Sequence, residues 1–349
     1  MTNQNKQPIT RHYILGIGRS GTTLLVNIFN RHKNVLATPE SVFTQFFFSS
    51  FKNKTVFTEK DIAAILDYLA TYEKLAPFIN WSFEYAYFKS IKYPLKITFD
   101  DLINLIHLQF KFPQHEKQEI RYIVEKNPGN SLFGEQLFQL NGNSKAIVMI
   151  RDYRANILSR KEKSHWRTPD VIYNAKRWLT FNQSLVKLKF KNPNKVLFIK
   201  YEDLVTNQEN TVKKIFSFLS IPYSKDLLYP RKEKQEKNLK EKYKHLSSEQ
   251  IEVLELKIKS INSSIYTSRI DKWKTGLSEL EIRNCDSICS RFGNNFGYET
   301  LKPFNTPLIL KLSPSLIKGR LSITKQKILF KLPYAIKLKR LKNIVSKIT

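Results

Sequence analysis

Cysteine is scarce in this 349-residue sequence, and clusters of metal-ligand side chains are missing. The two cysteines, Cys285 and Cys289, lie four residues apart in a segment with helical spacing. Two cysteines cannot build a disulfide framework, so the chain fits a reducing compartment and both thiols are expected in a core. They lack the nearby ligands of a zinc site, and no acidic cluster suggests magnesium, so no metal is expected.

Long hydrophobic runs are missing as well. No stretch approaches the ~18 consecutive apolar residues of a membrane span. The polar segment from Met1 to Arg11 lacks the apolar centre of a signal peptide. We therefore expect a cytoplasmic protein, which would be peripheral at a membrane if its basic C-terminal tail binds one.

Acidic residues are too few to balance the basic ones. The 59 Lys and Arg outnumber the 30 Asp and Glu, which gives a formal net charge of +29. Such an excess favours an anionic partner, and a nucleotide, an acidic glycan, a nucleic acid or an anionic membrane would all fit. A basic surface without a specific partner is the alternative. Hydrophobic residues make up 41% of the chain, which is enough to bury a core and excludes wholesale disorder.

Strand-like and helical segments alternate along the chain. Apolar runs typical of buried strands occur at residues 12–17, 35–37, 121–125, 146–150 and 196–201. Helical patterns lie between them, and this alternation predicts a parallel sheet with helices on both faces. We therefore expect an α/β fold with a P-loop-like parallel sheet flanked by helices.

Two segments depart from this alternation. Residues 42–120 are rich in aromatics and mostly helical in pattern, which predicts a helical insertion over the C-terminal edge of the sheet; its aromatics suit a core better than a binding platform. Residues 302–349 contain twelve Lys or Arg and no acidic residue. From Leu321 to Thr349 this basic tail has the pattern of an amphipathic helix. It can lie on an anionic membrane, dock on its own domain or stay mobile.

The strongest local motif is a glycine-bearing loop, Gly16-Ile-Gly-Arg-Ser-Gly-Thr-Thr23, between a predicted strand and a predicted helix. The N–H groups of such a loop can point at one anion, and the helix dipole adds roughly 0.3–1 kcal/mol. The spacing mimics the G-x-x-x-x-G-K-[ST] loop, but Thr22 replaces the lysine that reaches the β- and γ-phosphates. This replacement weakens a kinase or ATPase interpretation. Arg19 can supply the cation instead, and a plain glycine turn is the alternative.

The segment from Gly18 to Leu24, GRSGTTL, resembles the 5′-phosphosulfate loop of the sulfotransferase family. This family transfers a sulfuryl group from 3′-phosphoadenosine 5′-phosphosulfate (PAPS). The resemblance implies that the 5′-phosphosulfate end of the donor is gripped by Arg19, Ser20, Gly21, Thr22 and Thr23.

A second motif follows the predicted strand at 146–150. Arg151 leaves the end of this strand, and Ser159 lies eight residues on, about two helical turns later. Ligands of α/β folds bind at such strand ends. The pair resembles the Arg and Ser with which the family holds the ribose 3′-phosphate, although Tyr153 stands where the family often has proline. Ordinary charges at a solvated helix N-terminus are the alternative.

Two further segments resemble the family. Lys200 to Leu204 matches its Y-E-D-L segment, and Ile270 to Lys274 resembles a basic, tryptophan-bearing segment that often closes over the donor. The resemblance implies donor contacts from Tyr201 and from Lys272, with Lys274 as the alternative to Lys272. A packing role for Tyr201 and for Trp273 stays open.

Two residues resemble the family's catalytic groups. Glu40 follows the short strand at 35–37 and resembles the Glu that serves as base in tyrosylprotein and several carbohydrate sulfotransferases; a helix-capping carboxylate is the alternative. The cytosolic small-molecule branch uses a histidine, for which His107 and His165 are rivals. Lys126 resembles the lysine that stabilises charge on the departing phosphate oxygen, with an exposed loop lysine as the alternative.

The motifs together predict a PAPS-dependent sulfotransferase that needs no metal. The Glu-type site favours a hydroxyl of a carbohydrate, glycolipid or peptide acceptor over small phenols. We expect a sulfotransferase domain at residues 1–300, with an acceptor-side insertion at 42–120, and a basic tail at 301–349. A P-loop nucleotide phosphotransferase and a basic nucleic-acid-binding protein are the competing interpretations. The missing lysine opposes the first, the second leaves both phosphate motifs without purpose, and no nucleic acid is expected.

Overall fold

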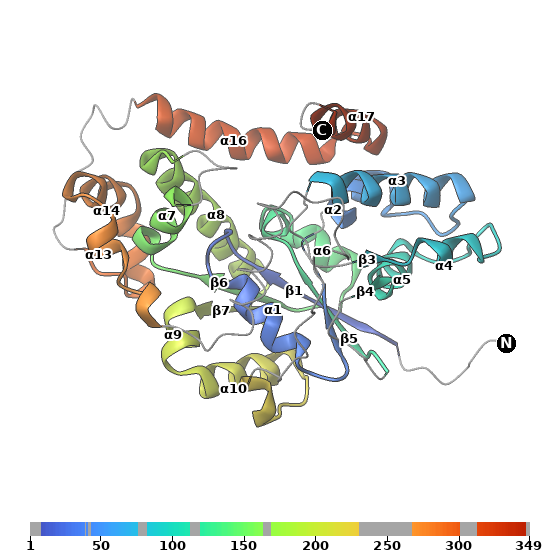
Figure 1. Cartoon of the computed structure of the whole chain (residues 1–349), viewed down its shortest axis with the longest axis horizontal. Coiled ribbons are helices and arrows are strands. Elements are labelled where there is room, and N and C mark those ends of the chain that lie inside the picture. Colours follow the sequence, from blue (N-terminus) through green and yellow to red (C-terminus); the bar gives the residue numbers. More distant parts are fainter. Residues whose placement is uncertain are drawn as a thin grey trace, which may run out of the picture.

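A parallel β-sheet forms the centre of the protein. The computed structural model describes residues 8–38, 40, 43–75, 82–111, 119–162, 169–229, 267–300 and 313–346. Five strands of this part form one sheet in the order β2-β5-β1-β6-β7, with every pair parallel (Figure 1). They are β1 (Thr10–Leu15), β2 (Val35–Ala37), β5 (Tyr122–Lys126), β6 (Ala146–Ile150) and β7 (Val196–Lys200). The predicted α/β architecture is therefore confirmed.

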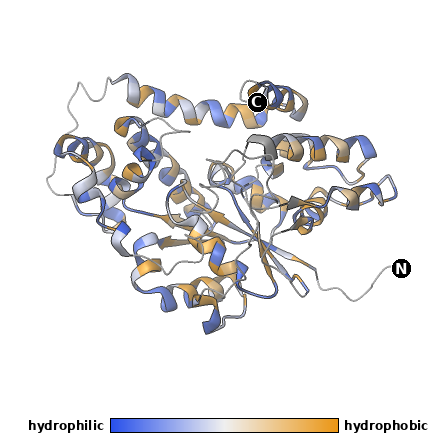
Figure 2. Ribbon diagram, viewed as in Figure 1, coloured by the Kyte–Doolittle hydropathy of each residue, from blue (hydrophilic) through white to orange (hydrophobic). Residues whose placement is uncertain are grey.

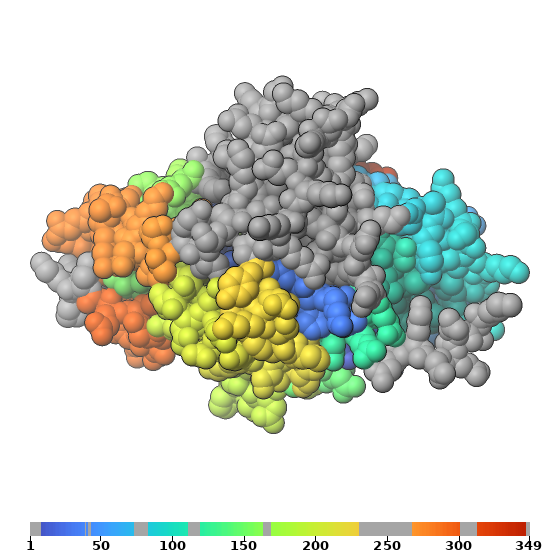
Figure 3. Space-filling model, turned by 60° about the horizontal axis from the view of Figure 1, so that its bottom comes forward, coloured from blue at the N-terminus to red at the C-terminus, as the bar shows by residue number. Residues whose placement is uncertain are grey.

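Helices cover both faces of the sheet, which is why its strands are apolar on both sides. In β6, Ile147 and Met149 face one layer and Ala146 and Val148 face the other, as the two-residue period of a strand requires. The hydropathy colouring shows the apolar residues gathered on the strands (Figure 2). The first layer contains α1 (Thr22–Asn30), α9 (Tyr201–Thr206), α10 (Gln208–Leu219) and η3 (Lys225–Leu228). Figure 3 shows the yellow surface of α10 and η3 beside the blue surface of α1.

The opposite layer is built mainly on one long helix. Trp178 on α8 is buried in the core of this layer, and Tyr153 packs edge-on against it. Cys285 and Cys289 are free thiols in the same core, as their spacing predicted. The helices of this layer are α6 (Gly134–Leu140), α7 (Tyr153–Lys161), α8 (Val171–Lys191), α13 (Trp273–Gly276) and α14 (Glu279–Gly293). The cytoplasmic location inferred from the cysteine usage stays a prediction.

The predicted helical insertion is present and has an aromatic core of its own. Phe47 and Phe51 of α2 stack on each other, and Phe51 also meets Phe57 and Phe99 edge-on. The aromatic stripes therefore form a core, the favoured alternative. The elements are α2 (Phe43–Phe51), α3 (Glu59–Leu75), α4 (Tyr85–Lys89), α5 (Phe99–Leu108) and the antiparallel pair β3 (Ser82–Phe83) and β4 (Phe110–Lys111).

The basic tail forms two helices, α16 (Pro314–Lys331) and α17 (Tyr334–Val345), where one helix was predicted from Leu321. Pro333 separates them because it has no N–H to continue the first helix. α16 packs on α8, and α17 packs on α2 and α3, where Tyr334 lies 5.2 Å from Phe47 between ring centroids (Figure 1). The tail thus docks on its own domain. In the described residues, no helix has the length and apolar character needed to cross a bilayer.

Candidate active site

The glycine-bearing loop joins β1 to α1 in a conformation that only certain residues adopt. Gly16 and Gly21 have positive φ angles of 135° and 85°, and a Cβ on Gly21 would lie 2.5 Å from the ring of Tyr201. Arg19 also has a positive φ, 75°, which is uncommon for a residue with a side chain and is typical of functional loops. Gly21 caps α1 without a side-chain hydrogen bond, so the first N–H groups of α1 keep their capacity to bind an anion.

Helix α7 is fastened to this loop. Arg19 donates from Nε to Ser159 Oγ at 3.0 Å. Asn156 donates from Nδ2 to Gly18 O and to Ser20 Oγ, both at 3.1 Å. The two predicted phosphate motifs therefore lie side by side. Asn156 was missed by the sequence reasoning, because its partners are loop groups far away in the chain.

Arg151 lies between the loop and a segment near the C-terminus. Its guanidinium donates to Arg19 O at 3.2 Å and to Arg269 O at 2.7 Å, and it stacks on the ring of Tyr201 at 4.3 Å. Its buried Nε has no hydrogen-bond partner in the part of the chain that the structure describes. Burial, together with the positive charge of Arg269, lowers the pKa of Arg151. An anion at this point would satisfy the spare donor and offset the repulsion between the two cations.

The C-terminal segment places Arg269 beside Arg151 and the predicted donor contact, Lys272, at the surface. Lys272, the predicted donor contact, is 55% exposed and pairs with Glu162 at 2.6 Å. Lys274 pairs with Asp271, also at the surface. The cation beside Arg151 is Arg269 instead, at the end of η4 (Thr267–Arg269). No motif marked Arg269, and only its position three residues before Lys272 could have suggested it.

Trp273 has a packing role. It is buried, and the guanidinium of Arg154 stacks on its ring at 4.0 Å. Arg154 in turn pairs with Asp152 at 2.7 Å and lies 3.7 Å from Asp286. These contacts anchor α13 to α7 and keep the 267–276 segment against the site.

Glu40 and Lys126 form an ion pair at the ends of two neighbouring strands. Lys126 ends β5 and its side chain is only 6% exposed, so it is not an exposed loop lysine. The Glu40 side chain is 43% exposed and can therefore be reached by a substrate. Burial and the charge of Glu40 raise the pKa of the Tyr72 hydroxyl on α3, so this hydroxyl lies within electrostatic reach of Glu40.

His107 sits behind this pair in a buried network. Its Nε2 lies 3.4 Å from Oε2 of Glu125, and this oxygen also accepts from Thr44 at 3.2 Å. The other oxygen, Oε1, accepts from Asn130 at 2.9 Å. Burial lowers the pKa of His107, which favours the neutral form of the ring beside the carboxylate. Such contacts are typical of a structural histidine. His165, the other rival, lies outside the described residues.

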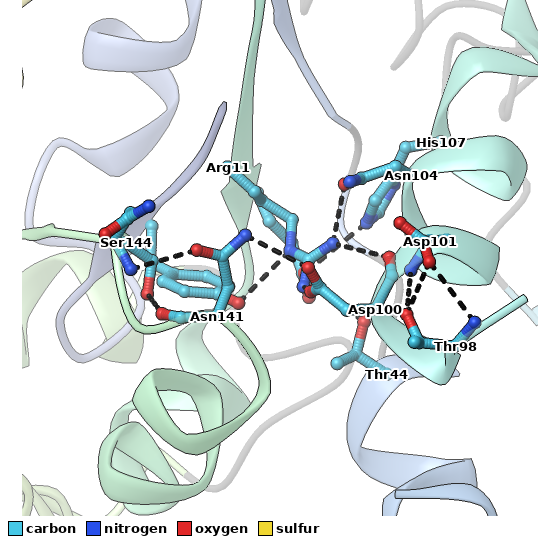
Figure 4. Close-up of polar contacts among 12 residues, drawn as sticks. Arg11, Thr44, Thr98, Asp100, Asp101, Asn104, His107, Asn141 and Ser144 are labelled. Atoms are coloured by element: carbon cyan, nitrogen blue, oxygen red, sulfur yellow. Dashed lines mark hydrogen bonds and ion pairs between the residues drawn. The ribbon is translucent and has the colours of Figure 1, made fainter. Parts of the chain in front are cut away.

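A buried arginine fastens the insertion to the sheet (Figure 4). Arg11 on β1 pairs with the carboxylate of Asp100 and donates to Asn104 Oδ1 at 2.6 Å and to Tyr13 at 3.1 Å. Asn141 donates to the other oxygen of Asp100 at 3.0 Å. No motif predicted this network, because a charged residue at a strand end is ordinarily solvated.

The family profile with the description "Sulfotransferase family" matches residues 13–225, which contain the loop, Glu40, Lys126, Arg151 and Ser159. The chain belongs to the sulfotransferase family. Two relatives carry the name "Putative protein-tyrosine sulfotransferase". The sulfotransferase is 23% identical to the one of Caenorhabditis briggsae over 297 residues, covering 82% of this chain and 89% of the relative. It is 25% identical to the one of Caenorhabditis elegans over 212 residues, covering 58% and 74%.

Solved structures show the same fold. A sulfotransferase domain from the curacin biosynthetic pathway matches with a TM-score of 0.53 and 18% identity, covering 84% of this sulfotransferase and 99% of that domain. The sulfotransferase domain of the Synechococcus PCC 7002 olefin synthase matches with a TM-score of 0.50 and 17% identity, covering 81% and 96%. No group of three or more metal-ligand side chains occurs within the described ranges.

Proposed function

We propose that this sulfotransferase uses PAPS as its sulfuryl donor. The environment of Arg151 supports this proposal most directly. Among the residues that the structure describes, the Nε of its buried guanidinium has no hydrogen-bond partner, and the group lies beside the loop and beside Arg269. Arg151, Ser159 and Arg269 would hold the 3′-phosphate. The N–H groups of residues 18–23 and the N-terminus of α1 would hold the 5′-phosphosulfate. Two anion sites on one surface fit a donor with two phosphate groups.

The chemistry would proceed at the Glu40–Lys126 pair. The acceptor oxygen forms a bond to sulfur as the bond between sulfur and the 5′-phosphate oxygen breaks. The acceptor proton passes to the carboxylate of Glu40, which lies beside Lys126. Lys126 stabilises the negative charge that develops on the departing phosphate oxygen. Adenosine 3′,5′-bisphosphate and the sulfated acceptor leave.

The acceptor is proposed to be a tyrosine hydroxyl of a peptide or protein. The names of the two nematode relatives support this choice over a carbohydrate or glycolipid hydroxyl, which the Glu-type site would also accommodate. The insertion at 42–120 would form the acceptor side of the domain at 1–300, because α2 begins three residues after Glu40 and Tyr72 of α3 lies near Glu40.

Calorimetric titration tests the donor site. Wild-type protein is expected to bind adenosine 3′,5′-bisphosphate tightly and to respond little to ATP with magnesium. Arg151→Ala and Arg269→Ala should both lose affinity by tenfold or more, whereas Lys272→Ala, which removes an exposed cation from the same segment, should not. Preference for ATP, or equal binding by wild type and Arg151→Ala, would rule out the proposed donor site.

Transfer of sulfate to peptides tests the acceptor. Protein incubated with PAPS and a tyrosine-containing peptide is expected to sulfate it, and the same peptide with phenylalanine in place of tyrosine should stay unmodified. Donor binding without peptide sulfation would reject the acceptor while leaving the donor assignment intact. A panel of glycans would then be the next set to assay.

A further inference from the structure

The two tail helices carry a surface that sulfuryl transfer does not use. Residues 313–346 contain nine Lys or Arg and no Asp or Glu. One side of α16 packs against the domain. Ile323 is buried in the α8 layer, and a Cβ on Gly319 would lie 3.0 Å from the carbonyl oxygen of Tyr173. The helix runs along the rim of the molecule (Figure 1). Its other side therefore faces away from α8.

An apolar stripe follows this outer side of α16. Ile317, Leu321 and Ile328 are 48%, 57% and 58% exposed. Their intervals of four and seven residues place the three side chains along one line of a helix with 3.6 residues per turn. Buried Ile323 and Gly319 lie on the opposite side. α16 thus has two apolar faces, and α8 covers only one of them.

Basic side chains flank the stripe on both edges. By the same helical geometry, Lys318 and Lys325 lie along one edge, and Arg320 and Lys327 lie along the other. Figure 2 shows the resulting alternation of hydrophobic and hydrophilic residues along α16. Long cationic side chains can cover apolar groups with their methylene stems while their charged ends reach outward. Further exposed cations come from α17, namely Lys339 and Arg340, whereas Lys342 pairs with Asp67 of α3 at 2.6 Å.

We propose that the outer face of α16, with α17 beside it, docks this sulfotransferase on an anionic phospholipid membrane. A lipid surface matches both parts of the pattern, because acyl chains accept the Ile and Leu side chains and lipid phosphates pair with the cations. A second copy of the chain does not match, since its own α16 carries the same positive charge. A nucleic acid would pair with the cations but leave three exposed apolar side chains in water. The proposal is independent of the donor and acceptor assignments.

Flotation with vesicles tests this surface in the full-length protein. Wild-type protein is expected to float with vesicles of phosphatidylcholine and phosphatidylglycerol, and not with phosphatidylcholine alone. The double variant Leu321→Glu, Ile328→Glu should lower the bound fraction at least tenfold at equal lipid. Leu280→Glu is the matched control, because Leu280 is 68% exposed on α14, outside the tail, and this variant should bind like wild type. Circular dichroism and bisphosphate titration verify that each variant is folded.

A fluorescent label gives a second measurement that does not depend on a charged variant. The native thiols of Cys285 and Cys289 are buried, so Leu321→Cys and Leu280→Cys can each be labelled with an environment-sensitive dye. Anionic vesicles should shift the emission to the blue at position 321 and not at position 280. The proposal is overturned if wild type does not float, if the double variant floats as well as wild type, or if the label at 321 stays in water. Equal loss of flotation in Leu280→Glu would also overturn it.

Discussion

Arg19 donates a hydrogen bond from Nε to Oγ of Ser159 at 3.0 Å, although 140 positions separate the two residues in the sequence. The bond joins the loop after β1 to the helix after β6. Arg151 reinforces it by donating to the backbone carbonyl of Arg19 at 3.2 Å. A ligand with phosphates at both ends would therefore contact both motifs at once. Its affinity for either motif would depend on the geometry of the other motif.

Ser159→Ala should weaken binding of adenosine 3′,5′-bisphosphate about tenfold, since a hydrogen bond to a charged group contributes about 1.5–3 kcal/mol. The variant removes the acceptor that positions Arg19 as well as a proposed ligand of the 3′-phosphate. Calorimetry provides the affinity. Ser184→Ala serves as the control, because Ser184 donates to the carbonyl of Thr180 within its own helix, α8. Equal affinity for the two variants would exclude a role for Ser159.

Gly21→Ala should abolish donor binding and lower the melting temperature. Its φ of 85° strains any residue with a Cβ, which costs about 1–3 kcal/mol, and the added atom would meet the ring of Tyr201 at 2.5 Å. Gly142→Ala is a matched control, since a Cβ there would have no atom within 4 Å. Scanning fluorimetry and calorimetry on both variants distinguish an effect specific to the loop from a general effect of replacing glycine by alanine. A Gly21→Ala protein that binds normally would contradict the loop assignment.

Glu40→Gln should reduce kcat by ~10²–10⁴ while leaving donor affinity nearly unchanged, as expected for the loss of a general base. Stopped assays with labelled PAPS give kcat, and titration gives the affinity. Glu135→Gln is the control, because Glu135 is also a half-exposed carboxylate paired with a lysine, Lys191, at 2.8 Å. Full activity of the Glu40→Gln variant would show that another residue acts as the base.

His12 should make the protein less stable in mild acid. Burial, with the nearby charge of Lys145, lowers the pKa of His12 from 6.5 to about 4. Between these values the unfolded chain binds a proton that the folded protein does not, so stability is present above pH 6.5 and is lost as the pH falls toward 4. The shift corresponds to about 3 kcal/mol. Urea unfolding at pH 7, 5.5 and 4.5 should show a shallower decline for His12→Asn than for wild type, and identical slopes would contradict the assignment.

The parts of the fold and site that could be predicted are those with a local signal. Helices cover both faces of strand β6, so all of its residues, Ala146–Ile150, are buried and apolar. This continuous apolar run allowed the bounds of the strand to be predicted without error. Arg19 and Arg151 were recognisable because each follows the end of its own strand, β1 or β6, within a few residues. The bounds of β1 were off by two residues, since Thr10 and Arg11 are polar and did not read as strand.

The parts that could not be predicted depend on contacts between distant residues. Arg269 reaches Arg151 only because the chain returns to the end of β6 after 118 positions. Arg11 can be buried because Asp100, 89 positions later, neutralises its charge. No residue close to Arg11 in the sequence indicates this partner. Lys272 lies three residues after Arg269 in the same segment, yet its side chain pairs with Glu162, 110 positions earlier in the chain. A basic residue in a sequence thus shows that a cation is available, and the packing of distant segments decides which cation lies beside Arg151.

The ion pair between Arg11 and Asp100 joins two hydrophobic cores whose sequences can change separately during evolution. The aromatic core of the insertion contains none of the strands of the central sheet, and this network is one of the places where the two cores meet. Residues inside the insertion can therefore exchange without disturbing the loop that follows β1. With the insertion on the acceptor side, as proposed, a fold built in this way can change its acceptor by repacking one core while the core around the sheet stays the same.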